Sequence, residues 1–149
     1  MKLSELLTEK NILIHFKAKD KKDALTKLVD KVEGISRNTI LTALMEREAL
    51  GSTGIGEGVA VPHVKLDSIE SLVIIFGLSH KPVPFDAIDG EPCSFFFLVL
   101  GSSKEEKQDQ YLKAMAKVSR LMRDEGFRSE LLKVQSPAET IDLIKKYEA

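Results

Sequence analysis

The chain has 149 residues, of which 43% are apolar and 30% charged, with 22 basic and 23 acidic side chains. This composition is typical of one globular domain, excludes a disordered chain, and argues against a nucleic-acid-binding protein, which needs an excess of positive charge. The longest fully apolar stretch, residues 95–100, is too short to cross a membrane, and the N-terminus lacks a signal-peptide pattern, so we expect a cytoplasmic protein.

The N-terminal third of the chain is predicted to be mainly helical. A short helix over residues 3–7 and a short strand over residues 12–14 come first. Apolar residues then recur at helical spacing over residues 20–33, and Gly34 follows as a stop signal. Ser36 can cap a further amphipathic helix that runs to about Leu50 and leads into a glycine-rich loop.

Two apolar runs are predicted to form the central strands. Residues 71–78 and 94–100 are apolar without alternation, which indicates strands that are covered on both faces. The link over residues 85–92 has a turn signal at Asp89-Gly90 and room for a short edge element. Because covered strands need a layer on each face, helices must supply that cover.

The C-terminal third is predicted to supply helices. Ser103 and Glu106 have the spacing of a capping box that opens a helix of about 18 residues. A shorter helix over residues 127–134 and a last helix that begins at Ser136-Pro137 follow. We therefore predict an α/β fold, with residues 1–149 forming a single layered domain of a central mixed sheet and helices on both faces.

Residues 47–65 are the one segment whose composition calls for a functional explanation. Glu57-Gly58 stands where a P-loop needs Lys-Ser/Thr, and the glycine spacing does not fit a dinucleotide-binding fingerprint. Glycines do allow backbone N–H groups to approach an anion closely, and neighbouring hydroxyls add donors. We therefore predict a phosphoryl-binding loop made by Ser52, Thr53, Gly54 and Gly56.

His63 and Arg47 are the candidate reactive residues beside this loop. His63 follows Pro62, whose fixed φ stiffens the approach, and imidazole is a nucleophile near neutral pH. Arg47 adds a permanent cation with a planar donor fork. A nucleophile, a cation and an amide-rich loop are the parts that phosphoryl transfer needs. The alternatives are a structural loop histidine and a solvated cation at a helix end.

The segment from Arg47 to His63, Arg-Glu-x-Leu-Gly-Ser-Thr-Gly-Ile-Gly-x-Gly-Val-Ala-Val-Pro-His, resembles the active-site signature of enzyme IIA of the sugar phosphotransferase system, fructose/mannitol type, including nitrogen-regulatory IIA proteins. The resemblance extends to residues 85–90, the second apolar strand and residues 112–122. It implies a phosphotransferase component in which His63 accepts a phosphoryl group from HPr, or from a nitrogen-branch HPr, and passes it to a IIB partner. It also associates Arg47 with the phosphorylated site.

The resemblance leaves two roles open. One is a phosphocarrier that supplies a sugar transporter. In this role the chain associates with a membrane transporter but does not itself span the membrane. The other is a stand-alone regulatory IIA protein whose phosphorylation state controls binding to a protein target. A third reading, an anion-binding domain without transfer chemistry, holds only if His63 is never phosphorylated. None of these roles calls for a cofactor.

Tyr111 marks a departure from the family pattern. Family members commonly carry a second active-site histidine just before a leucine early in the late helix, and the matching pair here is Tyr111-Leu112. Tyrosine can donate a hydrogen bond but cannot become an imidazolium. Tyr111 also lies on an apolar stripe with Met115 and Val118, so a packing role is the alternative.

The other histidines and the cysteine carry no further site. His15 and His80 have no ligand partner at a metal-binding spacing, so we expect no metal site. Cys93 is the single cysteine of the chain, which rules out an intrachain disulfide, and we interpret it as a small residue at a strand edge.

Overall fold

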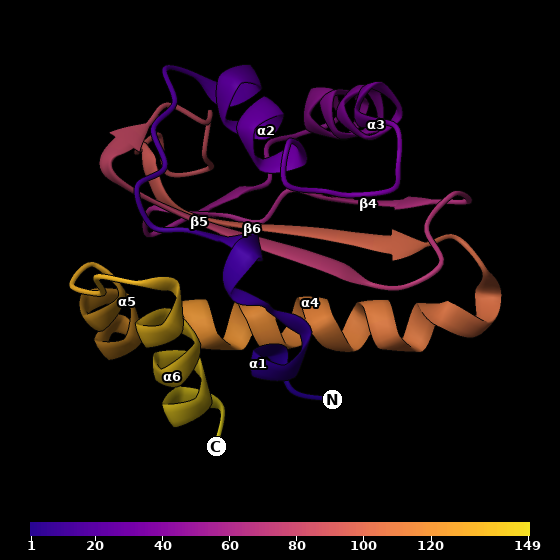
Figure 1. The fold of residues 1–149 in the computed structure, drawn as a ribbon. Helices are drawn as coiled ribbons and strands as arrows, with labels where there is room; N and C mark the ends of the chain where they lie inside the picture. The colour runs from indigo at the N-terminus through magenta and orange to yellow at the C-terminus, as the bar shows by residue number, and fades with distance from the viewer.

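Helices lie on both faces of a central sheet in the computed structural model, which describes residues 1–149 (Figure 1). On one face lie α2 (Lys21–Val29) and α3 (Arg37–Ala49). The other face is covered by α1 (Leu3–Leu6), α4 (Gln108–Arg123), α5 (Glu125–Leu131) and α6 (Pro137–Glu148). This arrangement confirms the predicted α/β layers.

The sheet is mixed, as predicted. Its order is β1-β5-β6-β3-β2, and β4 also pairs with β6. The β5–β6 and β2–β3 pairs are antiparallel, whereas β1–β5, β3–β6 and β4–β6 are parallel. The strands are β1 (Ile12–Leu13), β2 (Gly54–Gly56), β3 (Val59–Ala60), β4 (His63–Leu66), β5 (Val73–Val83) and β6 (Cys93–Ser102).

Two apolar clusters, one on each face of the sheet, form the core. In β6, Phe97 and Val99 belong to the cluster under α4, whereas Phe96 and Leu98 belong to the cluster under α2 and α3. Successive side chains of a strand point to opposite faces, so a strand covered on both faces needs apolar residues at every position. This requirement explains the unbroken apolar runs in the sequence.

Two helix starts lie where the sequence predicts them, and each is capped by a side chain close along the chain. Ser36 accepts a hydrogen bond from the Thr39 N–H at 3.3 Å, and Ser136 accepts one from the Glu139 N–H at 3.1 Å. The helix predicted over residues 20–33 instead ends at Val29. Beyond it the chain tightens into hydrogen-bonded turns that reach residue 32, and this part of the prediction is wrong.

The capping box predicted at Ser103 does not form. The helix α4 begins at Gln108, after a 3-10 helix η2 (Glu105–Lys107), and no side chain caps it. The Ser103 hydroxyl instead donates to the Asp67 carboxylate in the loop between β4 and β5. A tertiary partner has therefore taken the hydroxyl that the local pattern assigned to a cap.

The glycine-rich segment is more ordered than the predicted loop, because it contains β2, β3 and the start of β4. Glu57 and Gly58 join β2 to β3 and both have positive φ, 58° and 75°, as a two-residue hairpin turn of the primed type requires. The link over residues 85–92 holds no strand, so the edge element considered there is absent.

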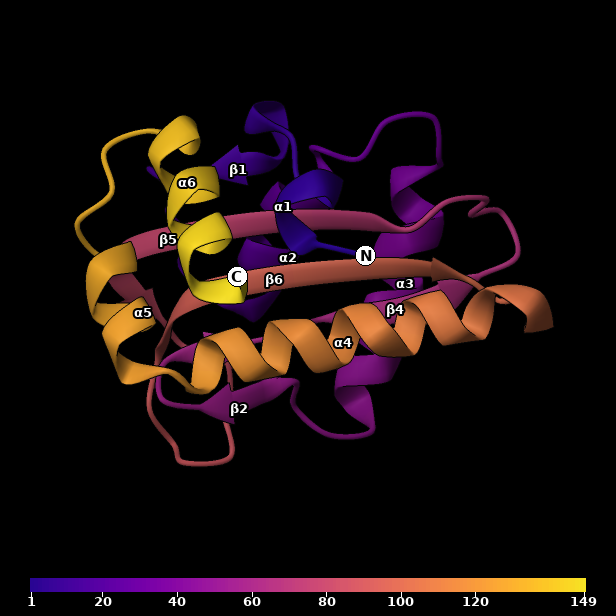
Figure 2. The ribbon, with the colours of Figure 1, turned by 90° about the horizontal axis from the view of Figure 1, so that it is seen from below.

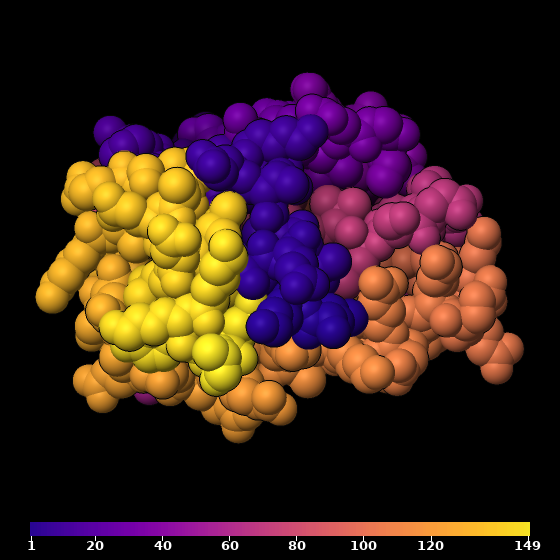
Figure 3. Space-filling model, turned by 60° about the horizontal axis from the view of Figure 1, so that its bottom comes forward, coloured from indigo at the N-terminus to yellow at the C-terminus, as the bar shows by residue number.

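The two ends of the chain lie side by side. The Glu148 carboxylate of α6 accepts hydrogen bonds from the backbone N–H groups of Leu3 and Ser4 at 2.9 and 3.0 Å. Figure 3 shows the indigo N-terminal segment against the yellow C-terminal helix. Each helix of the structure is too short or too polar to traverse a bilayer.

Candidate functional site

The imidazole of His63 is held by a carbonyl group two residues earlier. His63 is the first residue of β4, is half-buried, and its Nδ1 lies 2.7 Å from the Val61 carbonyl oxygen. Because a carbonyl can only accept, Nδ1 carries the ring proton and the lone pair is on Nε2. The Pro62 carbonyl accepts from the Val99 N–H at 2.9 Å, which fixes the chain just before the histidine.

The register of β4 on β6 puts His63 on the α4 face of the sheet. His63 is paired with Val99, which belongs to the core cluster under α4, and Lys65 is paired with Gly101. Paired residues on neighbouring strands point to the same face, so His63 and Lys65 both face α4. Figure 2 shows α4 running along β6 and β4.

Tyr111 packs on this face next to the same strand. Its ring fills the space over Gly101, where an added Cβ would lie 2.2 Å from the Tyr111 Cδ1. The side chain is 6% exposed, and Lys65 Nζ lies 5.7 Å from its ring centroid. The Tyr111 ring therefore has a packing role: it fills the core beside β4, the strand that carries His63.

The Tyr111 hydroxyl remains a neutral donor. Burial raises the pKa of Tyr111 to about 12, against a smaller opposing effect of the Arg47 charge. Tyr111 is therefore protonated at neutral pH. Arg47 and Tyr111 come from α3 and α4, which cover opposite faces of the sheet (Figure 1).

Arg47 stands in the last turn of α3, where the helix leads into the glycine-rich segment. Its Nη1 donates to the Gly51 carbonyl at 2.7 Å. A cation at a helix C-terminus is stabilised by the unpaired carbonyls there, and this bond also orients the guanidinium. The α3 helix packs against β4, so Arg47 and His63 belong to neighbouring elements.

The glycines of the predicted phosphoryl-binding loop serve backbone geometry. A Cβ on Gly54 would lie 2.8 Å from the Ala87 Cβ and 2.9 Å from its Cα, so no side chain fits there. Gly56 has a φ of +99°, which side chains rarely adopt, and it lies beside the Asp89 carboxylate. The Glu57 side chain, in the turn between β2 and β3, is 77% exposed.

The two hydroxyls of this loop are engaged within the protein, which differs from the free donors expected from the sequence. The Ser52 hydroxyl donates to the Phe85 carbonyl at 2.8 Å. Thr53 is 3% exposed, and its hydroxyl donates to the Glu48 carboxylate. Both bonds join the loop to neighbouring segments, so these hydroxyls shape the loop and do not face outward toward an anion.

Two charged residues near the site were missed at the level of sequence. Glu48 is a buried carboxylate that pairs with Lys21 from α2 at 3.0 Å. Lys65 faces α4 beside His63 and donates to Gln108 at 2.8 Å. If a strand had been predicted at residues 63–66, the spacing of two residues would have placed Lys65 on the same face as His63. Glu48 offered no local signal, because Lys21, which balances its charge, lies 27 residues away in the sequence.

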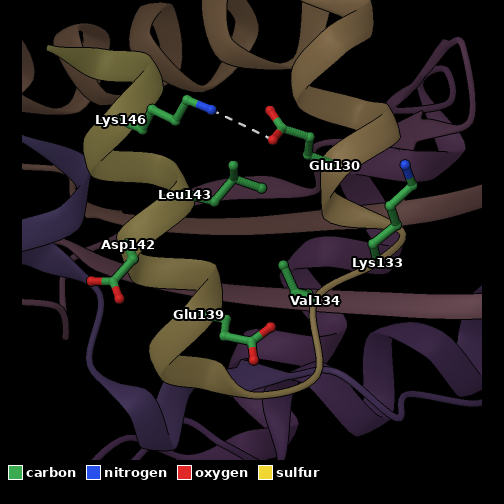
Figure 4. A pocket seen from close by; sticks show the side chains of 7 residues that line it. All are labelled: Glu130, Lys133, Val134, Glu139, Asp142, Leu143 and Lys146. Carbon is green, nitrogen blue, oxygen red and sulfur yellow. Dashed lines mark ion pairs between the residues drawn. The ribbon is translucent and has the colours of Figure 1, made fainter.

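Two cavities lie away from the candidate site residues. Figure 4 shows a pocket of about 400 Å³ between α5 and α6, where Lys146 pairs with Glu130 at 3.5 Å. A cavity of about 750 Å³ lies beside β1. Neither is lined by His63, Arg47 or Tyr111. No group of three or more histidine, cysteine, aspartate or glutamate side chains is arranged to hold a metal ion.

Comparison with known proteins decides the family. A family model described as "Phosphoenolpyruvate-dependent sugar phosphotransferase system, EIIA 2" matches residues 5–147. The chain belongs to this EIIA family. The resemblance drawn from residues 47–63 is thereby confirmed. The chain is 34% identical to a nitrogen regulatory protein of Bradyrhizobium diazoefficiens, over 88% of this chain and 86% of that protein.

A second relative of this EIIA chain is much longer. The chain is 33% identical to the PTS system fructose-specific EIIABC component of Bacillus subtilis over 99% of its own length, but it spans only 24% of that protein. Relatives of the EIIA chain therefore include both a fructose-specific EIIABC component and nitrogen regulatory proteins.

Solved structures share the fold of the EIIA chain. The crystal structure of the nitrogen regulatory protein IIA-Ntr from Neisseria meningitidis matches with a TM-score of 0.89 and 28% identity, over 95% of this chain and 98% of that chain. The complex of enzyme IIAMTL with phosphorylated enzyme IIBMTL from Escherichia coli matches with a TM-score of 0.80 over 94% and 97%. At 20% identity, the second likeness concerns the fold alone.

Proposed function

We propose that this EIIA chain is a histidine phosphocarrier, in which His63 accepts a phosphoryl group from a phosphorylated HPr-type protein and passes it to a IIB-type partner. The observation that carries the proposal is the 2.7 Å contact between His63 Nδ1 and the Val61 carbonyl, because it leaves the nucleophilic lone pair on Nε2. Family membership supplies the class of reaction.

The transfer follows from this geometry. The Nε2 lone pair of His63 attacks the phosphorus of the donor phosphohistidine, and the bond from phosphorus to the donor ring nitrogen breaks. The donor nitrogen keeps that electron pair, and the Nδ1 proton of His63 stays hydrogen-bonded to Val61. The step requires no cofactor, because positioning and charge stabilisation provide most of the catalysis of phosphoryl transfer.

Arg47 and Tyr111 are proposed to stabilise the phosphoryl group. The Arg47 fork matches phosphoryl oxygens, and its bond to Gly51 keeps it at the start of the glycine-rich segment. The Tyr111 hydroxyl is a neutral donor, since the pKa of Tyr111 is raised to about 12 by burial. Gly54 and Gly56 contribute backbone shape, to which the bonds made by Ser52 and Thr53 add rigidity.

The test is intact-mass analysis after incubation with phosphoenolpyruvate, enzyme I and HPr. We expect a mass increase of one phosphoryl group that is labile in acid, stable in alkali and absent from His63→Ala. His80→Ala is the matched control, because His80 is exposed and the hydrogen bond of its ring is to the Leu132 carbonyl. Equal labelling of the wild type and His63→Ala would refute the proposal.

A regulatory role is the second candidate, and the similarity to nitrogen regulatory proteins favours it. In that role, phosphorylation of His63 switches binding to a protein target in the cytoplasm, whereas a carrier for transport passes the group to a IIB protein and associates with a membrane transporter. Adding IIB proteins to the phosphorylated chain separates the two. Rapid loss of the label indicates transport, and a retained label with altered target binding indicates regulation.

A further inference from the structure

A buried ion pair lies behind the glycine-rich segment. The Glu48 side chain is 3% exposed and the Lys21 side chain 15% exposed, and Lys21 Nζ lies 3.0 Å from Glu48 Oε1. The same carboxylate accepts from the Thr53 N–H at 3.0 Å and from the Thr53 hydroxyl. A buried carboxylate is stable only when donors and an opposite charge surround it, so Glu48 ties Thr53 firmly to the end of α3.

Hydrogen bonds continue from this ion pair to the imidazole. The Thr53 carbonyl accepts from the Val61 N–H at 3.0 Å, and the Val61 carbonyl accepts from His63 Nδ1 at 2.7 Å. The chain of contacts therefore runs from Glu48 through Thr53 and Val61 to His63. Each member uses a different backbone or side-chain group, so the direction of the Val61 carbonyl depends on where Thr53 is held.

Lys21 joins this network to two further segments. Its Nζ lies 5.0 Å from the centroid of the Phe85 ring and 3.6 Å from the Asp86 carboxylate. Lys21 thus balances the charge of Glu48 and links the start of α2 to the loop after β5. Thr53 is consequently anchored, through Glu48 and Lys21, to α3 and α2.

We propose that Glu48, with its charge balanced by Lys21, is a positioning residue that holds His63 in its Nδ1–H tautomer through Thr53 and Val61. This inference rests on the proposed function, since only that tautomer presents the Nε2 lone pair to a phosphoryl donor. Neutral imidazole can carry its proton on either nitrogen, so the neighbouring carbonyl selects the tautomer. The Glu48 carboxylate bonds to Lys21 and Thr53 and not to the imidazole, so it acts on His63 indirectly.

The test compares Thr53→Val with wild type in two measurements. Ring 15N NMR of the unphosphorylated protein reports the His63 tautomer, and intact-mass time courses report phosphoryl uptake. Valine keeps the shape of threonine but removes the hydroxyl donor to Glu48. We expect a fall in the Nδ1–H population of His63 and an uptake rate lower by about ten- to hundred-fold, the cost of a misplaced reactive group. Thr53→Ser, which keeps the hydroxyl, should restore both.

Thr140→Val is the matched control, because Thr140 is fully buried and its hydroxyl bonds only within α6 and its cap. It should lower the melting temperature without moving the His63 ring signals. Glu48→Gln provides a second test if Thr53→Val does not fold, and it should shift the tautomer in the same direction. Unchanged ring signals in a folded Thr53→Val or Glu48→Gln would overturn the inference.

The two proposals fail in different ways. If the wild type is not phosphorylated on His63 but Thr53→Val shifts the ring signals, the proposed function fails and the positioning effect on the tautomer remains. If the wild type is phosphorylated and the Thr53→Val ring signals and uptake rate match the wild type, the positioning role is refuted and the function stands.

Discussion

At the scale of single residues, the candidate site combines one half-buried imidazole with groups that come from both faces of the sheet. His63 and Tyr111 lie on the α4 face, whereas Arg47 comes from the end of α3 on the other face. These residues can meet only at the edge of the sheet formed by β4. A site at an edge is open to a protein donor, which is what transfer between two histidines requires.

Arg47 should contribute to transfer more than to stability. Removal of one donor that stabilises a developing charge costs about 10²- to 10³-fold in rate in other enzymes, so we expect Arg47→Ala to slow phosphoryl uptake by about 10²-fold. The melting temperature should stay within about 2 °C, because the lost bond to Gly51 is exposed. Arg47→Lys should recover part of the rate, since an ammonium lacks the fork. Wild-type uptake by Arg47→Ala would refute this role.

Two substitutions of Tyr111 should separate the role of its hydroxyl in phosphoryl uptake from the role of its ring in stability. The Tyr111 hydroxyl makes no hydrogen bond within the protein and is not one of the protein's buried polar atoms, so Tyr111→Phe should leave the melting temperature unchanged. If the hydroxyl contacts the phosphoryl group, uptake should fall by about five-fold, equivalent to about 1 kcal/mol for one hydrogen bond. Tyr111→His should lower the melting temperature, because a smaller ring leaves space over Gly101. A silent Tyr111→Phe would leave Tyr111 with a packing role alone.

At the scale of elements, the β2–β3 hairpin shapes the loop before His63. Gly54 meets Ala87 from the loop after β5, and the Asp89 carboxylate accepts from the Glu57 N–H at 3.2 Å. The hairpin is therefore held from outside by residues 87–89 as well as by its own pairing. The strand β3 pairs with β6, and β4, which begins at His63, pairs further along β6.

Substitutions in this hairpin should follow backbone geometry. Gly56→Ala should cost about 1–2 kcal/mol of unfolding free energy, because its φ of +99° disfavours a side chain. Gly54→Ala should slow phosphorylation of His63, because the added Cβ would push against the Ala87 backbone and shift the hairpin. Glu57→Asn is the control for both, since asparagine tolerates the φ of 58° at the turn. Denaturant unfolding and uptake rates check these outcomes, and a more damaging Glu57→Asn would contradict them.

At the scale of the whole molecule, a carboxylate of the last helix caps the first. Glu148 accepts from the N–H groups of Leu3 and Ser4, a role that a local N-cap residue normally fills. Lys2, at the N-cap position of α1, makes no such bond. The contact joins α1 to α6, and both lie with α4 on the same face of the sheet (Figure 2).

Glu148→Gln should lower the unfolding free energy by about 1 kcal/mol at neutral pH, the usual scale of a cap. Burial by itself would raise the pKa of Glu148, but the hydrogen bonds from Ser4 and Leu3 lower it below the ordinary value of 4.5. A lowered folded-state pKa contributes stability above the unfolded-state pKa, and this contribution disappears as pH falls through the folded-state pKa. The difference between the variant and wild type should therefore shrink in acid, as chemical unfolding at several pH values will show. A constant difference would contradict the capping role.

Local patterns in the sequence were sufficient for the layers, the two long strands and the family. The helical spacing, the caps and the signature each involve residues that are close along the chain. The caps at Ser36 and Ser136, for example, bond to residues three positions later, so they do not depend on tertiary packing. Only the tertiary structure showed that Glu48 holds Thr53 with Lys21, that Tyr111 closes over Gly101, and that Glu148 caps α1. Lys21 and Leu3 lie 27 and 145 residues from their glutamate partners, and the contact of Tyr111 with Gly101 depends on how α4 packs on β6. Many segments could have supplied each of these partners, and the choice among them depends on tertiary packing, which no local periodicity encodes.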